Sequence, residues 1–448
     1  MENKSKLGFG ARGWILIVVL FTGFMSFQVF SNFPLNILGD FYGGSQKVAM
    51  FYTVATLISI VLQIVLSTFI AKIKSVKKMA AMVGIAAMIC AVAVSMIPYT
   101  MVTVWYVFYF MVNILINLYA LFSLSIIAGQ WFPRRKGTVM GIATIAYPFT
   151  NGVIGLFSER VYGLIGAGVD NMSAIRIGYI PFLVAAIGGF LLMLCFIKDY
   201  PEQCGGYRDN DHTLTAEKAK AIMEQEIIDK RTTVWTTKHI FMCRDFWFAA
   251  VTCGLILCAA VGTMSMSSAI IGSFEDLNFA VIMMVIAVCG AIGSWILGII
   301  DTAIGTKKSM MISVILMVLA GIIGAIATKT GIGALLAISM ILVAAFMGAS
   351  SNYTVSVAAQ YWRREDFSGV FACVNPIANI FNAIAPSIIA MLIASKLQIT
   401  GVFLFVMVAG IVGVILMLMF NAAHVKKVDD KYRQAAGKVL DDALVGRK

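Results

Sequence analysis

Carboxamide side chains recur at helical spacing inside stretches of this sequence that are otherwise apolar. The stretch from 28 to 36 carries an amide at every fourth position, and the stretch from 375 to 382 carries three close to one helical stripe. An isolated amide buried in hydrocarbon costs several kcal/mol, so these groups must face a wet cavity or one another. Their chemistry is recognition of a polar solute by hydrogen bonds. The predicted binding residues are Gln28, Asn32, Asn36, Asn113, Asn117, Tyr147, Asn151, Asn375, Asn379 and Asn382.

Two of these amides are favoured for the cavity because each follows a proline by three residues. Pro148 precedes Asn151 and Pro376 precedes Asn379. A proline inside a helix removes a backbone hydrogen bond and frees carbonyl groups nearby. The alternative for every amide is a structural bond between helices, which is common in membrane bundles.

A second set of polar residues is charged and clusters at the predicted inner ends of the apolar stretches. We hypothesise that Asp301 pairs with Arg363 or Arg364 and faces the N-terminal dipole of the fifth or eleventh stretch, closing an inner gate. Rim ion pairs contribute only about 0–1 kcal/mol each, so such a gate would bias an equilibrium. The alternative is that these charges serve topology alone. The predicted gate residues are Asp301, Lys307, Lys308, Arg134, Arg135, Arg363 and Arg364.

No ionisable residue lies inside the apolar stretches, where proton relays of membrane transporters usually sit. The nearest candidates for a proton site are Asp40 and Glu159, each at the predicted outer end of a stretch. This pattern favours facilitated diffusion or exchange, with proton-coupled symport as the alternative.

The elements that must position these residues are membrane-spanning helices. A chain of 448 residues that is 60% hydrophobic and 12% charged cannot cover a soluble surface with polar groups. About 20 apolar residues cross the hydrocarbon core as a helix. Twelve charge-free stretches are long enough, and we therefore predict an all-α integral membrane protein. They are 14–38, 48–71, 79–98, 104–130, 137–158, 177–197, 246–271, 279–300, 309–328, 333–359, 368–393 and 400–422.

The distribution of cations predicts the orientation. With the N-terminus in the cytoplasm, 29 of the 34 Lys and Arg residues fall on the inner side, and this places both termini inside. The net charge of +12 then faces anionic lipid, and nucleic acid is not expected as a partner. We expect a multi-pass protein of a bacterial cytoplasmic membrane that binds a small-molecule substrate and acts as a monomer.

An internal repeat divides the chain into two parallel halves. The segments "QWFPRRKG" and "QYWRREDFSG" begin 230 residues apart, and the pairs Lys77-Lys78 and Lys307-Lys308 have the same offset. Parallel repeats of this kind build transporters. We predict an N-terminal six-helix bundle at 1–198, a cytoplasmic linker with an amphipathic helix at 199–245, a C-terminal six-helix bundle at 246–423 and a cytoplasmic tail at 424–448.

The loop "GIIDTAIGTKK" and the 6+6 arrangement resemble the major facilitator superfamily, through Gly298, Asp301, Gly305, Lys307 and Lys308. The equivalent loop of the first half has lost the aspartate. "QWFPRRKGTVMGI" and "DYPEQCG" are similar to the oxalate/formate antiporter branch and its monocarboxylate-porter relatives. That resemblance implies alternating-access transport of a carboxylate-type organic anion. Oxalate-type members hold a dianion with an arginine in the eighth span and a lysine in the eleventh. Both residues are missing here.

Histidine and cysteine residues are the ones that could indicate a metal or enzyme site. The three histidines are scattered and the eight cysteines fall singly, so the sequence predicts no metal, no cofactor and no enzyme site. A solute sensor with a transporter fold remains an alternative. The small residues Gly290, Ser294 and Gly298 are interpreted as close helix packing.

Overall fold

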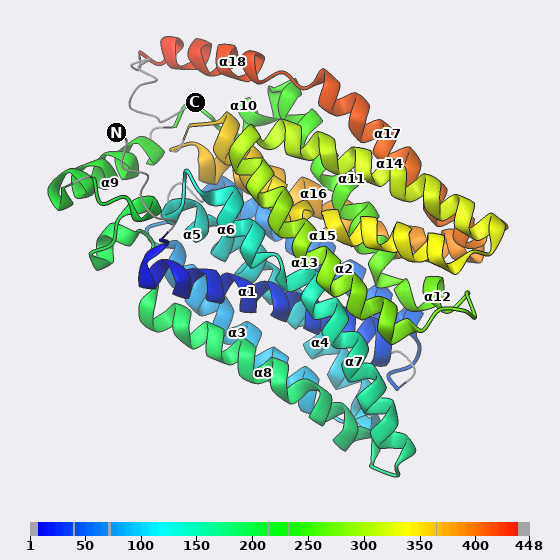
Figure 1. Cartoon of the computed structure of the whole chain (residues 1–448). Helices are drawn as coiled ribbons and strands as arrows, with labels where there is room; N and C mark the ends of the chain where they lie inside the picture. Colours follow the sequence, from blue (N-terminus) through cyan, green and yellow to red (C-terminus); the bar gives the residue numbers. More distant parts are fainter. Residues whose placement is uncertain are drawn as a thin grey trace.

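The computed structural model describes residues 8–38, 41–69, 73–213, 215–231, 233–363 and 365–437, and these contain helices and loops without a β-strand. Eleven helical segments are long and apolar enough to cross a membrane. A twelfth crossing is made by two consecutive helices, Lys136–Ala143 and Ala146–Gly166. This all-α architecture of twelve spans confirms the predicted fold class (Figure 1).

The first half contains six spans. They are α1 (Gly10–Phe33) with the π-helix η1 (Pro34–Leu38); α2 (Ser45–Phe69); α3 (Val76–Met96); a fourth span built from η2 (Tyr99–Met101), α4 (Val102–Ile116), the π-helix η3 (Asn117–Leu124) and α5 (Ser125–Trp131); a fifth built from α6 (Lys136–Ala143) and α7 (Ala146–Gly166); and α8 (Asn171–Phe196).

The second half repeats this order after a linker. The linker contains η4 (Pro201–Cys204), η5 (Arg208–Asn210), α9 (Ala216–Arg231) and α10 (Thr237–Met242). The spans are α11 (Arg244–Ser265) with α12 (Ser267–Ile271), α13 (Phe279–Ile304), α14 (Thr306–Thr330), α15 (Gly333–Tyr361), α16 (Phe367–Ala394) and α17 (Gln398–Met419), and the chain continues into α18 (Ala422–Ala435).

The fifth span is interrupted between Thr144 and Ile145 because of Pro148. A proline cannot donate to the carbonyl four residues earlier, and its ring clashes with that carbonyl, which here belongs to Thr144. The Thr144 hydroxyl instead donates to the carbonyl of Met140 at 2.8 Å and closes the end of α6. The single helix predicted over 137–158 is therefore two helices.

The two halves meet along two seams. One is formed by α13 against α6 and α7, and the other by α16 against α2. Glycines allow the first seam to close: a Cβ on Gly298 would lie 2.9 Å from the Cα of Gly141. Ser294 donates to the carbonyl of Gly141 at 3.1 Å in the same seam. Gly298 and Ser294 thus have the packing role predicted for them.

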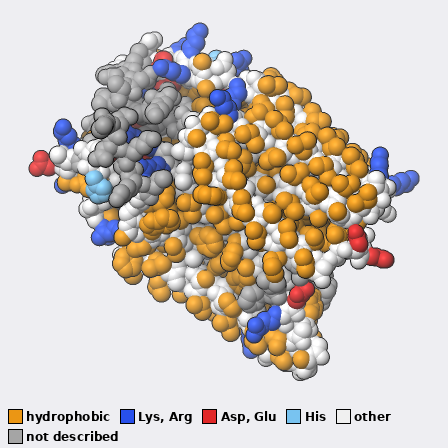
Figure 2. All heavy atoms as spheres, in the orientation of Figure 1, with side chains coloured by type: hydrophobic (Ala, Val, Ile, Leu, Met, Phe, Trp, Pro, Cys, Tyr) orange, Lys and Arg blue, Asp and Glu red, His pale blue; other side chains and the backbone are white. Residues whose placement is uncertain are grey.

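The surface of the bundle separates into an apolar side and two polar ends. Figure 2 shows hydrophobic side chains covering the side of the bundle, with charged side chains gathered towards its ends. We call the end that carries Gly10, Trp131, α9 and α18 the terminal face (Figure 1), and the opposite end, with α12, the distal face. An apolar side of this kind is what a hydrocarbon environment requires.

Candidate functional site

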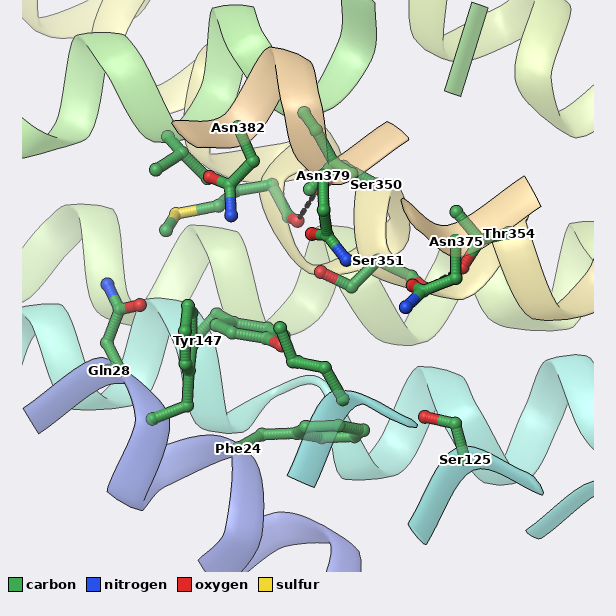
Figure 3. A pocket seen from close by; sticks show the side chains of 15 residues that line it. Phe24, Gln28, Ser125, Tyr147, Ser350, Ser351, Thr354, Asn375, Asn379 and Asn382 are labelled. Carbon is green, nitrogen blue, oxygen red and sulfur yellow. Dashed lines mark hydrogen bonds between the residues drawn. The ribbon is translucent and has the colours of Figure 1, made fainter. Parts of the chain in front are cut away.

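A small cavity lies between the two halves, midway along the spans. Figure 3 shows amide and hydroxyl side chains of α15 and α16 facing Phe24, Gln28 and Tyr147 of the first half. Its volume is about 30 Å³. That is room for about two waters, whereas ligand pockets usually measure roughly 300–1,000 Å³. The cavity is therefore too small for an organic solute as it stands, and admission of one requires the halves to move apart.

Five of the ten predicted binding residues line this cavity. They are Gln28, Tyr147, Asn375, Asn379 and Asn382. The three asparagines share one face of α16 because they are spaced by four and three residues. No Asp, Glu, Lys, Arg or His is present among the side chains that line the cavity in the described part of the chain.

The lining amides differ in how they are bonded. Gln28 donates to the Asn151 side chain at 2.5 Å, and Asn375 donates across the seam between the halves to Gln63 at 2.9 Å. Asn379 Nδ2 and Asn382 Oδ1, in contrast, have no hydrogen-bond partner among the described residues. Both side chains are buried. Because an unpaired buried polar group is costly, these two atoms are the best placed to bind a solute.

The other predicted binding residues lie behind the lining or outside it. Asn151 holds Gln28 from behind. Asn113 accepts from the Ser31 hydroxyl at 2.8 Å, and Asn117 donates to the carbonyl of Asn113 at 2.7 Å. Asn32 is buried in α1 without lining the cavity. The side chain of Asn36 lies outside the described set.

Several lining residues were not predicted from the sequence. Ser350, Ser351 and Thr354 present hydroxyls from α15, and Ser125 presents one from α5. Hydroxyls gave no signal because they can bond within their own helix, as Ser350 does to the carbonyl of Met347 at 2.5 Å. The four-residue spacing of Ser350 and Thr354, which places both on one face of α15, was a signal that could have indicated them.

Aromatic side chains from both halves pack together beside the cavity. Phe371 stacks on Phe122 of the first half, with ring centroids 6.3 Å apart, and Phe367 lies 5.8 Å from Phe371. On the first-half wall of the cavity, Phe24 stacks on Tyr147 at 5.5 Å. The pair of Phe122 and Phe371 thus contributes to the contact between the halves.

Asp301 lies at the seam between the halves, against the first turn of α6. It accepts a hydrogen bond from Ser356 at 2.5 Å, and a Cβ on Gly137 would lie 2.6 Å from its Oδ2. The predicted pair between Asp301 and Arg363 is wrong, since Arg363 donates to Asp429 at 3.0 Å. Arg364 lies outside the described residues. Asp301 lies beside the N-terminal turn of α6, in the fifth span, and its role in a gate stays a prediction.

The remaining predicted gate cations bind the linker or the ends of neighbouring spans. The backbone N–H groups of Arg134 and Arg135 donate to Asp209 at 3.2 and 3.0 Å. Lys307 donates to the carbonyl of Phe420, at the end of α17, at 2.6 Å. Lys308 is exposed at the same rim.

The two predicted proton sites are remote from the cavity. Glu159 is exposed on α7 in its distal part, and Asp40 lies outside the described residues. The described lining of the cavity contains no Asp or Glu that could act as a proton site in their place.

Arg363 belongs to a buried charge network that fixes α18 to the terminal face. Arg433 donates to Asp429 at 3.0 Å and to Asp366 at 2.5 Å. The indole of Trp235, from the linker, donates to Asp429 at 2.8 Å. The sequence did not indicate this network, because it joins the linker, the tail and the loop before α16, which are far apart along the chain.

Replacing Asp366 with asparagine should remove a pH dependence of stability. Burial, followed by the charge of Glu365, raises the pKa of Asp366 to about 7, against the opposing effect of Arg433. The folded protein therefore keeps a proton that the unfolded chain releases above its ordinary pKa of 3.8. This stabilisation is present at low pH and is lost as the pH rises through about 7.

Thermal unfolding in detergent from pH 5 to 8 measures this effect. We expect the free energy of unfolding of the wild type to fall by about 2 kcal/mol over that range. Asp366→Asn should show a flat profile. Asp430→Asn, on the same tail helix as Asp429, serves as the control and should keep the slope; a flat wild-type profile would contradict the assignment.

Comparisons with known proteins agree with this fold. Residues 254–445 match the family model of the Major Facilitator Superfamily. No curated protein matches the sequence. The fold is similar to that of the proton:xylose symporter XylE bound to 6-bromo-6-deoxy-D-glucose, with a TM-score of 0.71 at 12% identity over 91% of this chain and 95% of the other. It is also similar to the human organic anion transporter MFSD10 (TETRAN), with a TM-score of 0.61 at 10% identity over 92% and 100% of the two chains. The chain thus has the major facilitator fold.

Proposed function

We propose that this protein, which has the fold of major facilitator transporters, is a secondary transporter that moves a small organic solute across a membrane by alternating access. The observation that carries the proposal is the closed polar cavity at the meeting point of two six-span bundles. In transporters built from two repeats, the substrate site lies near mid-membrane at their interface. A cavity too small for a solute in the closed state fits a cycle in which each face opens in turn.

We further propose a carboxylate-type organic anion as the substrate, carried by exchange or facilitated diffusion. The amide of Asn379 and the hydroxyls of Tyr147 and Thr354 can donate to carboxylate oxygens. The absence of a charged group from the described lining favours an anion of single charge over a dianion. It also leaves no group there to carry a proton, which favours uncoupled movement. The likeness to the oxalate/formate branch points to the same class.

The substrates named for the two similar structures differ in class, so they do not favour an anion over a neutral solute. One is described as a proton:xylose symporter and the other as an organic anion transporter. A neutral hydroxylated solute, held by the free Asn379 Nδ2 and Asn382 Oδ1, is therefore the second candidate. We also propose that the terminal face is cytoplasmic. The sequence predicts most of the Lys and Arg residues on the side of the two termini, and cytoplasmic loops are the ones enriched in these residues.

Uptake and counterflow in liposomes test this function. The panel contains labelled monocarboxylates, dicarboxylates and neutral polyols, with and without a pH gradient. We expect counterflow of a monocarboxylate that is unaffected by the gradient. Accumulation driven by an inward proton gradient would overturn uncoupled movement, transport of polyols alone would overturn the anion, and binding without transport would indicate a sensor.

A further inference from the structure

Lys136 is a buried cation for which the closed structure provides no hydrogen-bond partner. Its side chain is 3% exposed, and Nζ bonds to no described residue. The ammonium instead lies 3.1 Å from the centroid of the Phe367 ring. Asp301 supplies an opposing charge nearby, but it does not accept a hydrogen bond from Lys136. A lysine is normally buried only with a partner, so this position calls for a physical reason.

This cation lies between the two halves. Lys136 is the first residue of α6 in the first half, and Phe367 is the first residue of α16 in the second half. Gly129 of α5 makes the space for them: a Cβ there would lie 2.7 Å from Lys136 Nζ and 2.4 Å from the Phe367 ring. The contact therefore holds only while the halves are closed at the terminal face.

Lys136 also lies on the line from the cavity to the terminal face. Along α16, Asn375 lines the cavity, Phe371 follows one turn closer to the terminal face, and Phe367 follows one turn further. Along α5, Ser125 lines the cavity, and Gly129, which contacts Lys136, is one turn closer to the same face. The two residues that contact the ammonium thus lie one turn (Gly129) and two turns (Phe367) from the cavity-lining residues of their own helices, toward the terminal face.

The buried position between the halves is unfavourable for the Lys136 ammonium, and separation of the halves would return it to water. An aromatic face offsets only part of the cost of removing an ammonium from water. When the halves part at the terminal face, Phe367 moves away with α16 and Nζ gains access to the opening passage. An anionic solute in that passage would meet a fixed positive charge in a region of low dielectric, where the attraction is strong.

We propose that Lys136 is the anion-binding cation of the terminal side of the transport route, which binds the carboxylate of a solute entering or leaving the cavity while that side is open. The inference rests on the proposed transport of a carboxylate. It assigns selectivity for anions to one face of the membrane, because nothing equivalent lines the cavity itself in the described residues.

The test compares apparent affinities at the two faces in liposomes with oriented protein. The solutes are a transported monocarboxylate and a neutral analogue of the same shape. The variants are Lys136→Gln, Lys136→Arg and the control Lys198→Gln, which removes a cation at an exposed position just after α8. We expect Lys136→Gln to raise the KM for the carboxylate at the terminal face about tenfold or more, because a charge-assisted bond is lost.

The other measurements separate binding from structure. The KM at the distal face and the KM for any neutral solute should stay unchanged in Lys136→Gln, while Lys136→Arg and Lys198→Gln should resemble the wild type. Equal changes at both faces, or equal changes for neutral and anionic solutes, would overturn the inference. If the glutamine variant does not fold, Lys136→Cys modified to carry an aminoethyl group should restore the anion KM, and failure to do so counts against the role.

The measurements on the wild type distinguish a wrong substrate from a wrong role of Lys136. A wild type that carries no carboxylate overturns both the substrate and the role of Lys136. A wild type that carries a carboxylate with a KM independent of Lys136 overturns only the role of Lys136.

Discussion

Replacing Asn379 with alanine should lower the transport rate at low solute concentration about 10- to 100-fold, the loss expected when a hydrogen bond to a charged group is removed. Asn379 lines the cavity and its Nδ2 is free of partners among the described residues. The same substitution should leave the melting temperature unchanged or raise it, since it removes a buried polar atom that no protein group satisfies. Function and stability are therefore expected to separate at this position.

Asn117→Ala is the matched control for this experiment. Asn117 is also a fully buried amide in mid-membrane, but it donates to the carbonyl of Asn113 and does not line the cavity. Its loss should leave the KM unchanged, because the side chain does not line the cavity. Initial uptake rates and thermal unfolding of both variants check the pair. If Asn379→Ala transported normally, the cavity assignment would be wrong, and if Asn117→Ala raised the KM, the site would extend beyond the cavity.

Replacing Gly298 with valine should abolish transport by preventing closure at the terminal face. The new Cβ would lie 2.9 Å from the carbonyl oxygen of Gly137 and from the Cα of Gly141. Both neighbours are backbone atoms of α6, so no side-chain rotation can relieve the overlap. The closed state should lose several kcal/mol relative to the open one, and a shift of about 3 kcal/mol changes the ratio of two conformations by more than 100-fold.

Two measurements identify this effect. The first is counterflow, which should fall to background in Gly298→Val. The second is labelling of a Ser125→Cys probe, in a background without the native cysteines, by an impermeant thiol reagent applied at the terminal face. We expect fast labelling in Gly298→Val and slow labelling in the parent.

The chain also offers a matched glycine for the control. Gly188 in α8 has open space around its missing Cβ. Gly188→Val adds the same side chain within a helix and should leave transport and labelling unchanged. Normal counterflow by Gly298→Val would show that the seam does not need to close at this point.

Much of the architecture can be predicted from the sequence, because hydrocarbon permits few backbone conformations. Backbone groups in hydrocarbon must bond within their own segment, so a long charge-free stretch has to be a helix. For the same reason the predicted spans and the described helices agree closely except at the fifth span. There Pro148 and the carbonyl of Thr144 conflict, and the local backbone forms two helices.

The candidate site was predicted in part. The stripe of Asn375, Asn379 and Asn382 could be found because apolar surroundings make an amide conspicuous and helical spacing fixes its direction. Asn113 and Asn117 have the same chemistry and spacing, yet they bond within the first half. The sequence cannot separate these cases, since both remove an amide from hydrocarbon equally well.

The sequence by itself determined the membrane class, the helices, the repeat and the residue types available for binding, because these depend on composition and on short periods along one helix. Only the tertiary structure decided the partners. Asp301 binds Ser356, Arg363 binds Asp429, and Lys136 lies against Phe367. Each contact joins residues from separate helices, and charge alone does not select among partners, because an ion pair depends on distance and burial that only the packing of the halves sets.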